Sequence, residues 1–213
     1  MTNDATIGLI KTKLCKPLPG KPSHIKMASL EMNHKYYEPS EDPKRAAVLV
    51  VLFYVNEVLH IIYMKRPGDN QNDKHAGQIS FPGGQLERGD KSLEACAIRE
   101  TNEELGLIPS DIEVLGALSP LYIHVSNFMV YPFVAFHHGT PKYNLQKTEV
   151  ANTIEFPVKN LFHEKIIKIT DITIRNNSIK NVPYFNLNGE ILWGATAMIT
   201  NEFRTIMQTE FLN

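Results

Sequence analysis

The sequence predicts an α+β fold, an α/β/α sandwich in which a mixed β-sheet lies between helices and carries an N-terminal extension. A nearly unbroken apolar, β-branched run at 47–55 is typical of a buried strand. A capped amphipathic pattern at 92–105 is typical of a helix. Strand and helix patterns are interleaved without regular alternation, which favours a mixed sheet. We expect an arm at 1–45 that packs on a domain at 46–213.

The elements follow in chain order. A short amphipathic helix is expected at 7–14, before the breaker-rich stretch 17–22. The strand at 47–55 is expected to turn at Asn56-Glu57 and return at 58–64. Further extended segments are expected at 78–81 (ending at Pro82-Gly83-Gly84), 112–118, 128–136, 154–162 (an edge strand or turn that ends at Pro157), 166–174 and 184–187, and a closing helix at 195–211.

The helix at 92–105 has the clearest boundaries. Asp90 and Ser92 are candidate N-caps, and Gly106 is the expected residue after the C-terminus. Pro109 prevents the helix from continuing. The residues expected to face the core recur every four positions: Leu93, Ala97, Thr101 and Leu105.

Composition excludes several function classes. The 213 residues are 43% apolar and 21% charged, with a formal net charge of −1, so the chain lacks the basic field of a polynucleotide-binding protein. The two cysteines, Cys15 and Cys96, provide neither a disulfide framework nor a metal-ligand spacing, and Cys96 is interpreted as a small core residue. No apolar run has the length of a membrane span, and no signal pattern begins the chain, so a cytoplasmic location is expected.

Glu100, Glu103 and Glu104 are candidate ligands for a metal ion. Their i, i+3 and i+4 spacing places all three carboxylates on one helix face, where each like-charged pair costs about 0.2–0.5 kcal/mol. A bound cation would offset that repulsion, and hard oxygen ligands suit Mg²⁺ or Mn²⁺. Taken alone, the cluster is more often a solvated acidic face. Upstream, however, the paired glycines Gly83-Gly84 let the backbone turn tightly and expose a carbonyl or N–H group to a ligand.

The combination resembles the Nudix box, G-x5-E-x7-R-E-U-x-E-E-x-G-U, where U is apolar. The matching residues are Gly84, Asp90, Arg99, Glu100, Glu103, Glu104, Gly106 and Leu107. Asp90 replaces the first glutamate, Thr101 stands at an apolar position, and eight residues rather than seven separate Asp90 from Arg99. Asp90 is therefore left out of the expected metal ligands, and Glu87 is the alternative acidic residue of that loop.

The longer spacing looks like the variant box of the coenzyme A pyrophosphatases within this superfamily. That subgroup also has an upstream motif, roughly L-L-T-x-R-S-x-x-L-R-x-H-A-G-Q-V-S-F-P-G-G, which the stretch 75–84 matches almost completely. After Arg66, Pro67-Gly68 replaces the small polar pair, and the loop to Lys74 is longer. The segments 18–27 and 193–197 also resemble the subgroup's N-terminal arm and the start of its last helix.

The resemblance implies a Nudix-like fold and a metal-dependent attack of water on a pyrophosphate phosphorus. Glu100, Glu103 and Glu104 would hold Mg²⁺ or Mn²⁺ together with the carbonyl of Gly83 or Gly84. Arg99 would orient one of these glutamates.

Other residues are assigned to the substrate or to the loops around it. Arg66 and Lys74 are candidates for binding phosphate, with solvated loop cations as the alternative. His75 and Gln78 are candidates for substrate contacts or for bracing the loop. Glu149 is a weak candidate for a further ligand or a general base, and Trp193 is interpreted as a core residue.

Three functions remain open from the sequence. The first is hydrolysis of coenzyme A or its acyl derivatives to 3′-phosphoadenosine 5′-phosphate and 4′-phosphopantetheine. The second keeps the chemistry and changes the substrate to ADP-ribose, NADH or a nucleoside triphosphate. The third is a non-catalytic nucleotide-binding module, which the intact glutamates and Arg99 disfavour. The resemblance also favours a homodimer.

Overall fold

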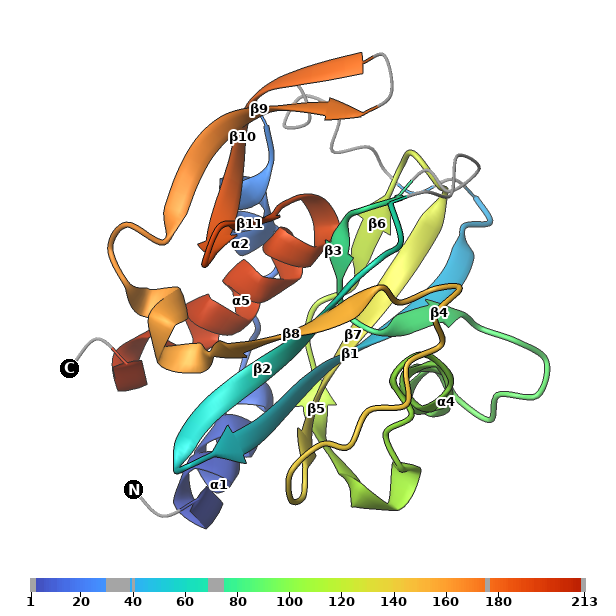
Figure 1. Ribbon diagram of the computed structural model, residues 1–213, viewed down its shortest axis with the longest axis vertical. Helices are drawn as coiled ribbons and strands as arrows, with labels where there is room; N and C mark the ends of the chain where they lie inside the picture. The colour runs from blue at the N-terminus through green and yellow to red at the C-terminus, as the bar shows by residue number, and fades with distance from the viewer. Residues whose placement is uncertain (1–2, 30–38, 40, 69–74, 175–176, 212–213) are drawn as a thin grey trace.

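The computed structural model describes residues 3–29, 39, 41–68, 75–174 and 177–211 (Figure 1). Its helices are α1 (Asn3–Leu14), α2 (Lys21–His24), α4 (Leu93–Leu105) and α5 (Gly194–Phe211), with 3₁₀ turns η1 (Ile25–Met27), η2 (Pro109–Asp111) and η3 (Val158–Phe162). Its strands are β1 (Lys44–Val55), β2 (Val58–Lys65), β3 (Ile79–Ser80), β4 (Gly83–Gln85), β5 (Ile112–Ala117), β6 (Leu121–Ile123), β7 (Phe128–His137), β8 (Asn152–Pro157), β9 (Ile167–Ile174), β10 (Asn177–Leu187) and β11 (Glu190–Leu192). No helix among these described residues is long and apolar enough to cross a membrane.

The central sheet has β1 in its middle and contains both strand directions. Its order is β3-β2-β1-β7-β5, while β4 pairs with β1, β6 with β7 and β8 with β2. β1 runs parallel to β7 and antiparallel to β2 and β4. Parallel neighbours require a crossover connection, and the chain between β1 and β7 includes α4. The predicted mixed sheet is therefore confirmed.

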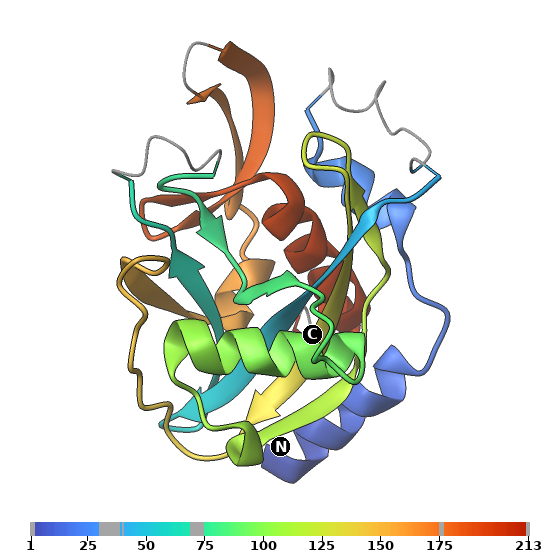
Figure 2. The same ribbon diagram turned by 90° about the vertical axis from the view of Figure 1, so that its right-hand side faces the viewer.

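β1 explains why helices cover both faces of the sheet. Its side chains alternate between two hydrophobic clusters, because successive residues of a strand point to opposite faces. Val50 and Leu52 pack with residues of α1 and α5, whereas Leu49 and Val51 pack with residues of α4. Figure 2 shows α4 in front of the sheet and α5 behind it. The expected α/β/α sandwich is thus observed.

The first hairpin forms where the sequence predicts it. Asn56 and Glu57 connect β1 to β2, and both have positive φ angles, 46° and 64°. Two central residues with positive φ make a type I′ turn, whose twist matches that of the flanking strands. The register Val55↔Val58 follows directly from this two-residue loop.

The segment between β9 (Ile167–Ile174) and α5 (Gly194–Phe211) departs from the predicted pattern, although these two elements lie within one residue of the expected bounds. A second, three-stranded sheet, β11-β10-β9, lies at the top of Figure 1. The expected strand at 184–187 is only the end of β10, which begins at Asn177. Lys65 at the end of β2 joins this sheet to the central one, since its Nζ lies 2.7 Å from Oε1 of Glu190. The first half of β10 was not predicted as a strand because it is rich in polar residues and lacks the alternation of apolar and polar residues that indicates a strand.

The N-terminal arm is held against α5 through a buried carboxylate. Glu202 accepts hydrogen bonds from the backbone N–H groups of Gly20 (3.0 Å) and Ser119 (3.1 Å), and its Oε2 lies 2.9 Å from Nε2 of His24. Burial alone would raise the pKa of Glu202, but these partners outweigh it and lower the pKa. β1 begins at Lys44, inside the residues assigned to the arm. The division of the chain near residue 45 stays a prediction.

Candidate active site

α4 begins and ends at its predicted caps. The hydroxyl of Ser92 accepts a hydrogen bond from the N–H of Ala95 at 3.0 Å. Gly106 adopts the left-handed conformation, with φ of 74°, and its N–H bonds to the carbonyl of Asn102. Such caps satisfy backbone groups that a helix end leaves without partners. The other candidate cap, Asp90, instead binds Arg99.

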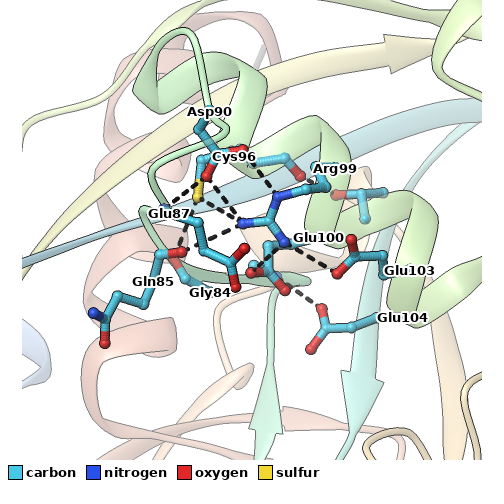
Figure 3. A network of polar contacts seen from close by, with 12 residues as sticks. Gly84, Gln85, Glu87, Asp90, Cys96, Arg99, Glu100, Glu103 and Glu104 are labelled. Carbon is cyan, nitrogen blue, oxygen red and sulfur yellow. Dashed lines mark hydrogen bonds and ion pairs between the residues drawn. The ribbon is translucent and has the colours of Figure 1, made fainter.

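The expected core face of α4 packs on the sheet. Ala97, Thr101 and Leu105 are buried, whereas Leu93 is only partly buried. Residues three and four apart share a helix face, and the three glutamates project from α4 towards β4, as Figure 3 shows. Their burial is graded: Glu104 is 2% exposed, while the side chains of Glu100 and Glu103 are 15% and 50% exposed. The cluster thus extends from the protein interior to solvent.

Gly83 and Gly84 form a strand, not the tight turn that the sequence suggested. They belong to β4, which pairs antiparallel with β1 in the register Ala47↔Gly84 and Val48↔Gly83. A Cβ atom on Gly83 would overlap the carbonyl of Ala47, and one on Gly84 would overlap the carboxylate of Glu100. Glycine therefore lets β4 lie close to β1 at Gly83 and close to the side chain of Glu100 at Gly84.

Gly83 also binds the most buried of the three α4 glutamates directly. Its N–H donates to Oε2 of Glu104 at 2.8 Å. The thiol of Cys96 lies 3.6 Å from the carbonyl oxygen of Gly84. Cys96 is fully buried, as expected for a core residue, but this polar contact was not anticipated. Both contacts fix β4 against α4.

Arg99 connects the acidic loop to the helix glutamates (Figure 3). Its Nε and Nη2 donate to the two carboxylate oxygens of Asp90 at 2.9 and 3.0 Å, which is a bidentate pair. Its Nη1 lies 2.9 Å from Oε1 of Glu100 and 3.0 Å from Oε2 of Glu103. The hydrogen bonds from Arg99 hold the pKa of Asp90 down, at about 2. Glu87 approaches Asp90 only through its backbone N–H, and its side chain is exposed.

Burial raises the pKa of the inner glutamates. It is the largest influence on Glu104, whose pKa rises to about 8, and the negative charges of Glu100 and Glu149 act in the same direction. The N–H of Gly83 and the positive charge of Arg66 oppose this rise. Burial likewise raises the pKa of Glu100. A group of carboxylates that resists ionisation in this way would be stabilised by a divalent cation.

The loop at 138–151 brings Glu149 to the cluster. The N–H of Asn144 donates to the carbonyl of Leu105 at 2.9 Å, and the N–H of Gln146 donates to the carbonyl of Glu104 at 3.0 Å. These bonds cap the C-terminal end of α4 and hold the loop against it. The Gln146 side chain then donates to Glu149 at 3.1 Å. The sequence offered no account of this segment, because the contacts join residues about 40 positions apart.

The structure brings three of the four predicted substrate residues together, where β2 ends and β3 begins. The N–H of Arg66 donates to the carbonyl of Gln78 at 2.9 Å, and Nδ1 of His75 lies 3.1 Å from Oε1 of Gln78. The loop-bracing interpretation of His75 and Gln78 agrees with this pair. Lys74 lies outside the described residues.

The strands, the glycines and the glutamates form the pattern of a known family. A sequence model of the NUDIX domain matches residues 43–174, which span β1, β4, α4 and β8. The chain belongs to the Nudix hydrolase family. It is an enzyme that acts on pyrophosphate bonds, so the non-catalytic reading of the sequence is set aside.

Two relatives are similar to this Nudix chain in sequence, and two solved structures are similar to it in fold. The uncharacterized Nudix hydrolase NudL of Pectobacterium atrosepticum is 30% identical over 165 residues, covering 77% of this chain and 83% of that protein. The NudL of Citrobacter koseri is 36% identical over 129 residues, covering 61% of this chain and 66% of that protein. A MutT/nudix family protein from Enterococcus faecalis is 17% identical with a TM-score of 0.51, covering 91% of this chain and 76% of that one. The MutT protein of Methanosarcina mazei Go1 is 15% identical with the same TM-score, 0.51, covering 80% and 98%. The two structures support the fold alone.

The Nudix box can be tested for its fit to a divalent ion. Within the described residues, no three His, Cys, Asp or Glu side chains converge into a ready-made metal group. Glu103 is paired with Arg99, and Glu104 with the N–H of Gly83. The available ligand atoms are nevertheless all oxygens, and burial, together with neighbouring carboxylates, raises the pKa values of Glu100 and Glu104. That donor set fits Mg²⁺ or Mn²⁺, the ions that Nudix hydrolases generally use.

Gly84→Ala is expected to impair activity without unfolding the protein. The atoms nearest to the added methyl group belong to the carboxylate end of the Glu100 side chain, which can swing away, so the melting temperature should change little. The displaced carboxylate should lower kcat/KM by about 10- to 100-fold, the usual effect of disturbing metal-ligand support. Gly89→Ala, in open space, is the matched control. Unchanged kinetics in Gly84→Ala would show that Glu100 need not lie against β4.

Proposed function

We propose that this Nudix hydrolase cleaves the pyrophosphate bond of coenzyme A or its acyl derivatives, yielding 3′-phosphoadenosine 5′-phosphate and 4′-phosphopantetheine or its acylated form. The observation that carries the proposal is the stretch 75–84, which resembles the motif of the coenzyme A subgroup. This stretch ends in the two glycines that contact Glu100 and Glu104. The subgroup motif and the Nudix box are thus parts of one site.

In this proposal the glutamates hold the ion and Arg99 positions them. Glu100, Glu103 and Glu104 would bind Mg²⁺ or Mn²⁺ together with the carbonyl of Gly84. When bound, the ion neutralises pyrophosphate oxygens and lowers the pKa of water, which supplies the nucleophile. Arg99 orients Glu100 and Glu103 through Nη1 while Asp90 fixes its Nε and Nη2.

The other residues would act on the proton and on the substrate. We assign to Glu149 either a further ion contact or the removal of a proton from the attacking water, since its charge acts on both Glu100 and Glu104. Arg66 would neutralise a phosphate oxygen, and Lys74 is proposed for the same task. His75 and Gln78 would hold the loop that carries Arg66, or contact the substrate themselves. A homodimer is proposed on the resemblance alone.

The deciding experiment is a substrate panel. Purified protein is incubated with coenzyme A, acetyl coenzyme A, ADP-ribose, NADH and nucleoside triphosphates, each with Mg²⁺, Mn²⁺ or excess EDTA, and products are separated by chromatography. We expect ion-dependent release of 3′-phosphoadenosine 5′-phosphate, with the other substrates at least about tenfold slower in kcat/KM, a difference of about 1.4 kcal/mol in transition-state binding. Faster cleavage of another substrate would reject the coenzyme A assignment and leave the Nudix chemistry in place.

A further inference from the structure

The hydroxyl of Ser80 is unusual among the side chains that the structure describes. Its Oγ is buried, and no residue in the described part of the chain forms a hydrogen bond with it. Buried polar groups in native proteins are almost always paired, so each exception needs an explanation. One explanation is that the partner arrives with a ligand.

The direction of the Ser80 side chain follows from its neighbours. Ile79 and Phe81 belong to the hydrophobic cluster on the α5 side of the sheet. Side chains alternate along an extended segment, so Ser80 points to the opposite side. Its antiparallel partner Met64 belongs to the cluster beneath α4, and paired residues share a face. Ser80 therefore lies on the face that carries the catalytic glutamates.

The backbone around Ser80 is held in place. Ser80 pairs with β2, and Phe81 packs on Tyr63 with ring centroids 4.9 Å apart. Two residues further, the N–H of Gly83 binds Glu104. The hydroxyl thus sits on a fixed segment and does not depend on a flexible loop for its position.

A cationic residue stands diagonally across the same face. The bond from the N–H of Arg66 to the carbonyl of Gln78 continues the β2–β3 register by one residue pair. Arg66 is two positions from Met64, which puts it on the side of Met64 and Ser80. Arg66 also lowers the pKa of Glu104 by its charge, so it lies near the glutamates. A neutral donor and a guanidinium on the face of an acidic cluster suit an anionic oxygen, whose charge a bound divalent ion would also neutralise.

We propose that Ser80 is a substrate-positioning residue that donates its hydroxyl hydrogen bond to a non-bridging oxygen of the substrate pyrophosphate. The inference rests on the proposed hydrolysis at the α4 carboxylates, but not on which group the pyrophosphate carries. Hydrogen bonding to a ground-state oxygen that persists in the transition state is uniform binding, which changes KM and leaves kcat nearly unchanged.

The test compares Ser80→Ala with Ser80→Thr, which keeps a hydroxyl, and with Ser178→Ala, a control on the exposed part of β10. Three quantities are measured: the ligand-free melting temperature, KM and kcat for whichever pyrophosphate substrate the wild type cleaves, and calorimetric affinity for imidodiphosphate with Mg²⁺. We expect Ser80→Ala to melt no lower than wild type, because its hydroxyl forms no hydrogen bond with any residue that the structure describes. Its KM and its dissociation constant for imidodiphosphate should rise about tenfold, as for one hydrogen bond to a charged group, and Ser80→Thr should recover most of the loss.

A lower melting temperature with unchanged KM and imidodiphosphate affinity would overturn the inference and assign the hydroxyl to a structural water. Unchanged values of all three quantities would overturn it as well. Failure of the coenzyme A proposal is seen separately, in the wild type, as preference for another substrate. The imidodiphosphate measurement stays valid in that case because this probe lacks any nucleoside.

Discussion

Glu104→Gln is expected to lower kcat by about 10³-fold while it makes the ion-free protein more stable at alkaline pH. An ion that neutralises charge in the transition state is worth several kcal/mol, and each 1.36 kcal/mol is a factor of ten in rate. Glutamine has the same shape and can still accept the hydrogen bond from Gly83, but it is a poor ligand for a hard cation. The substitution should therefore lower kcat and raise the stability of the ion-free protein at alkaline pH.

The alkaline effect follows from the pKa of Glu104. Burial raises it from the ordinary value of 4.5 to about 8, so the folded protein holds this proton more tightly than the unfolded chain does. The corresponding stability is fully present below pH 4.5 and is lost as the pH rises through about 8. A glutamine does not titrate, so the variant should lack this loss.

Thermal unfolding in EDTA at pH 6 and pH 9, together with kcat in Mn²⁺, tests both statements. Glu94→Gln, an exposed position in the first turn of the same helix, is the matched control and should leave both quantities at wild-type values. If Glu104→Gln retained more than about a tenth of the wild-type kcat, Glu104 would not be an ion ligand. If its melting temperature fell as steeply as that of wild type between the two pH values, the carboxylate would not be the source of the alkaline loss.

Arg99→Lys should cost about 10- to 100-fold in activity although it keeps the positive charge, since that is the usual effect of losing a residue that orients a metal ligand. Arginine binds Asp90 with Nε and Nη2 and leaves Nη1 for Glu100 and Glu103. A lysine ammonium group is a single point charge and cannot reproduce this fork. We expect the lysine variant to require more Mn²⁺ for half-maximal activity, measured by metal titration. A half-saturating Mn²⁺ concentration equal to that of wild type would contradict the positioning role.

The same pair makes a prediction for acid unfolding. The hydrogen bonds from Arg99 lower the pKa of Asp90 from 3.8 to about 2, so the folded protein releases this proton more readily than the unfolded chain. The stability from the ionised pair is present above pH 3.8 and is lost as the pH falls through about 2. Asp90→Asn should lack the fall in the free energy of unfolding that protonation of Asp90 causes, as measured by urea unfolding between pH 5 and pH 2. An acid profile identical to that of wild type would show that Asp90 is not held ionised by Arg99.

Much of the site-bearing framework is local and was predictable. The caps Ser92 and Gly106 and the turn at Asn56-Glu57 depend on contacts within a few residues, and the apolar run of β1 is continuous in the sequence, so short patterns specify these elements. The i, i+3 and i+4 spacing likewise put the three glutamates on one face without any knowledge of the fold. The contacts of Glu100 and Glu103 with Arg99 lie within about one turn of the same helix.

The tertiary structure decided everything that depends on distant parts of the chain. Gly83 and Gly84 looked like a turn because their partners, Ala47 and Val48, lie about 36 positions earlier. The approach of Glu149 depends on a loop that caps the far end of α4. The orphaned hydroxyl of Ser80 is defined only by what surrounds it. By itself, the sequence determined the chemical groups and their local spacing, because side-chain directions repeat with a fixed period along a helix or strand. Which groups meet, how deeply they are buried, and hence how strongly their pKa values shift are set by the packing of sheet, helix and loop.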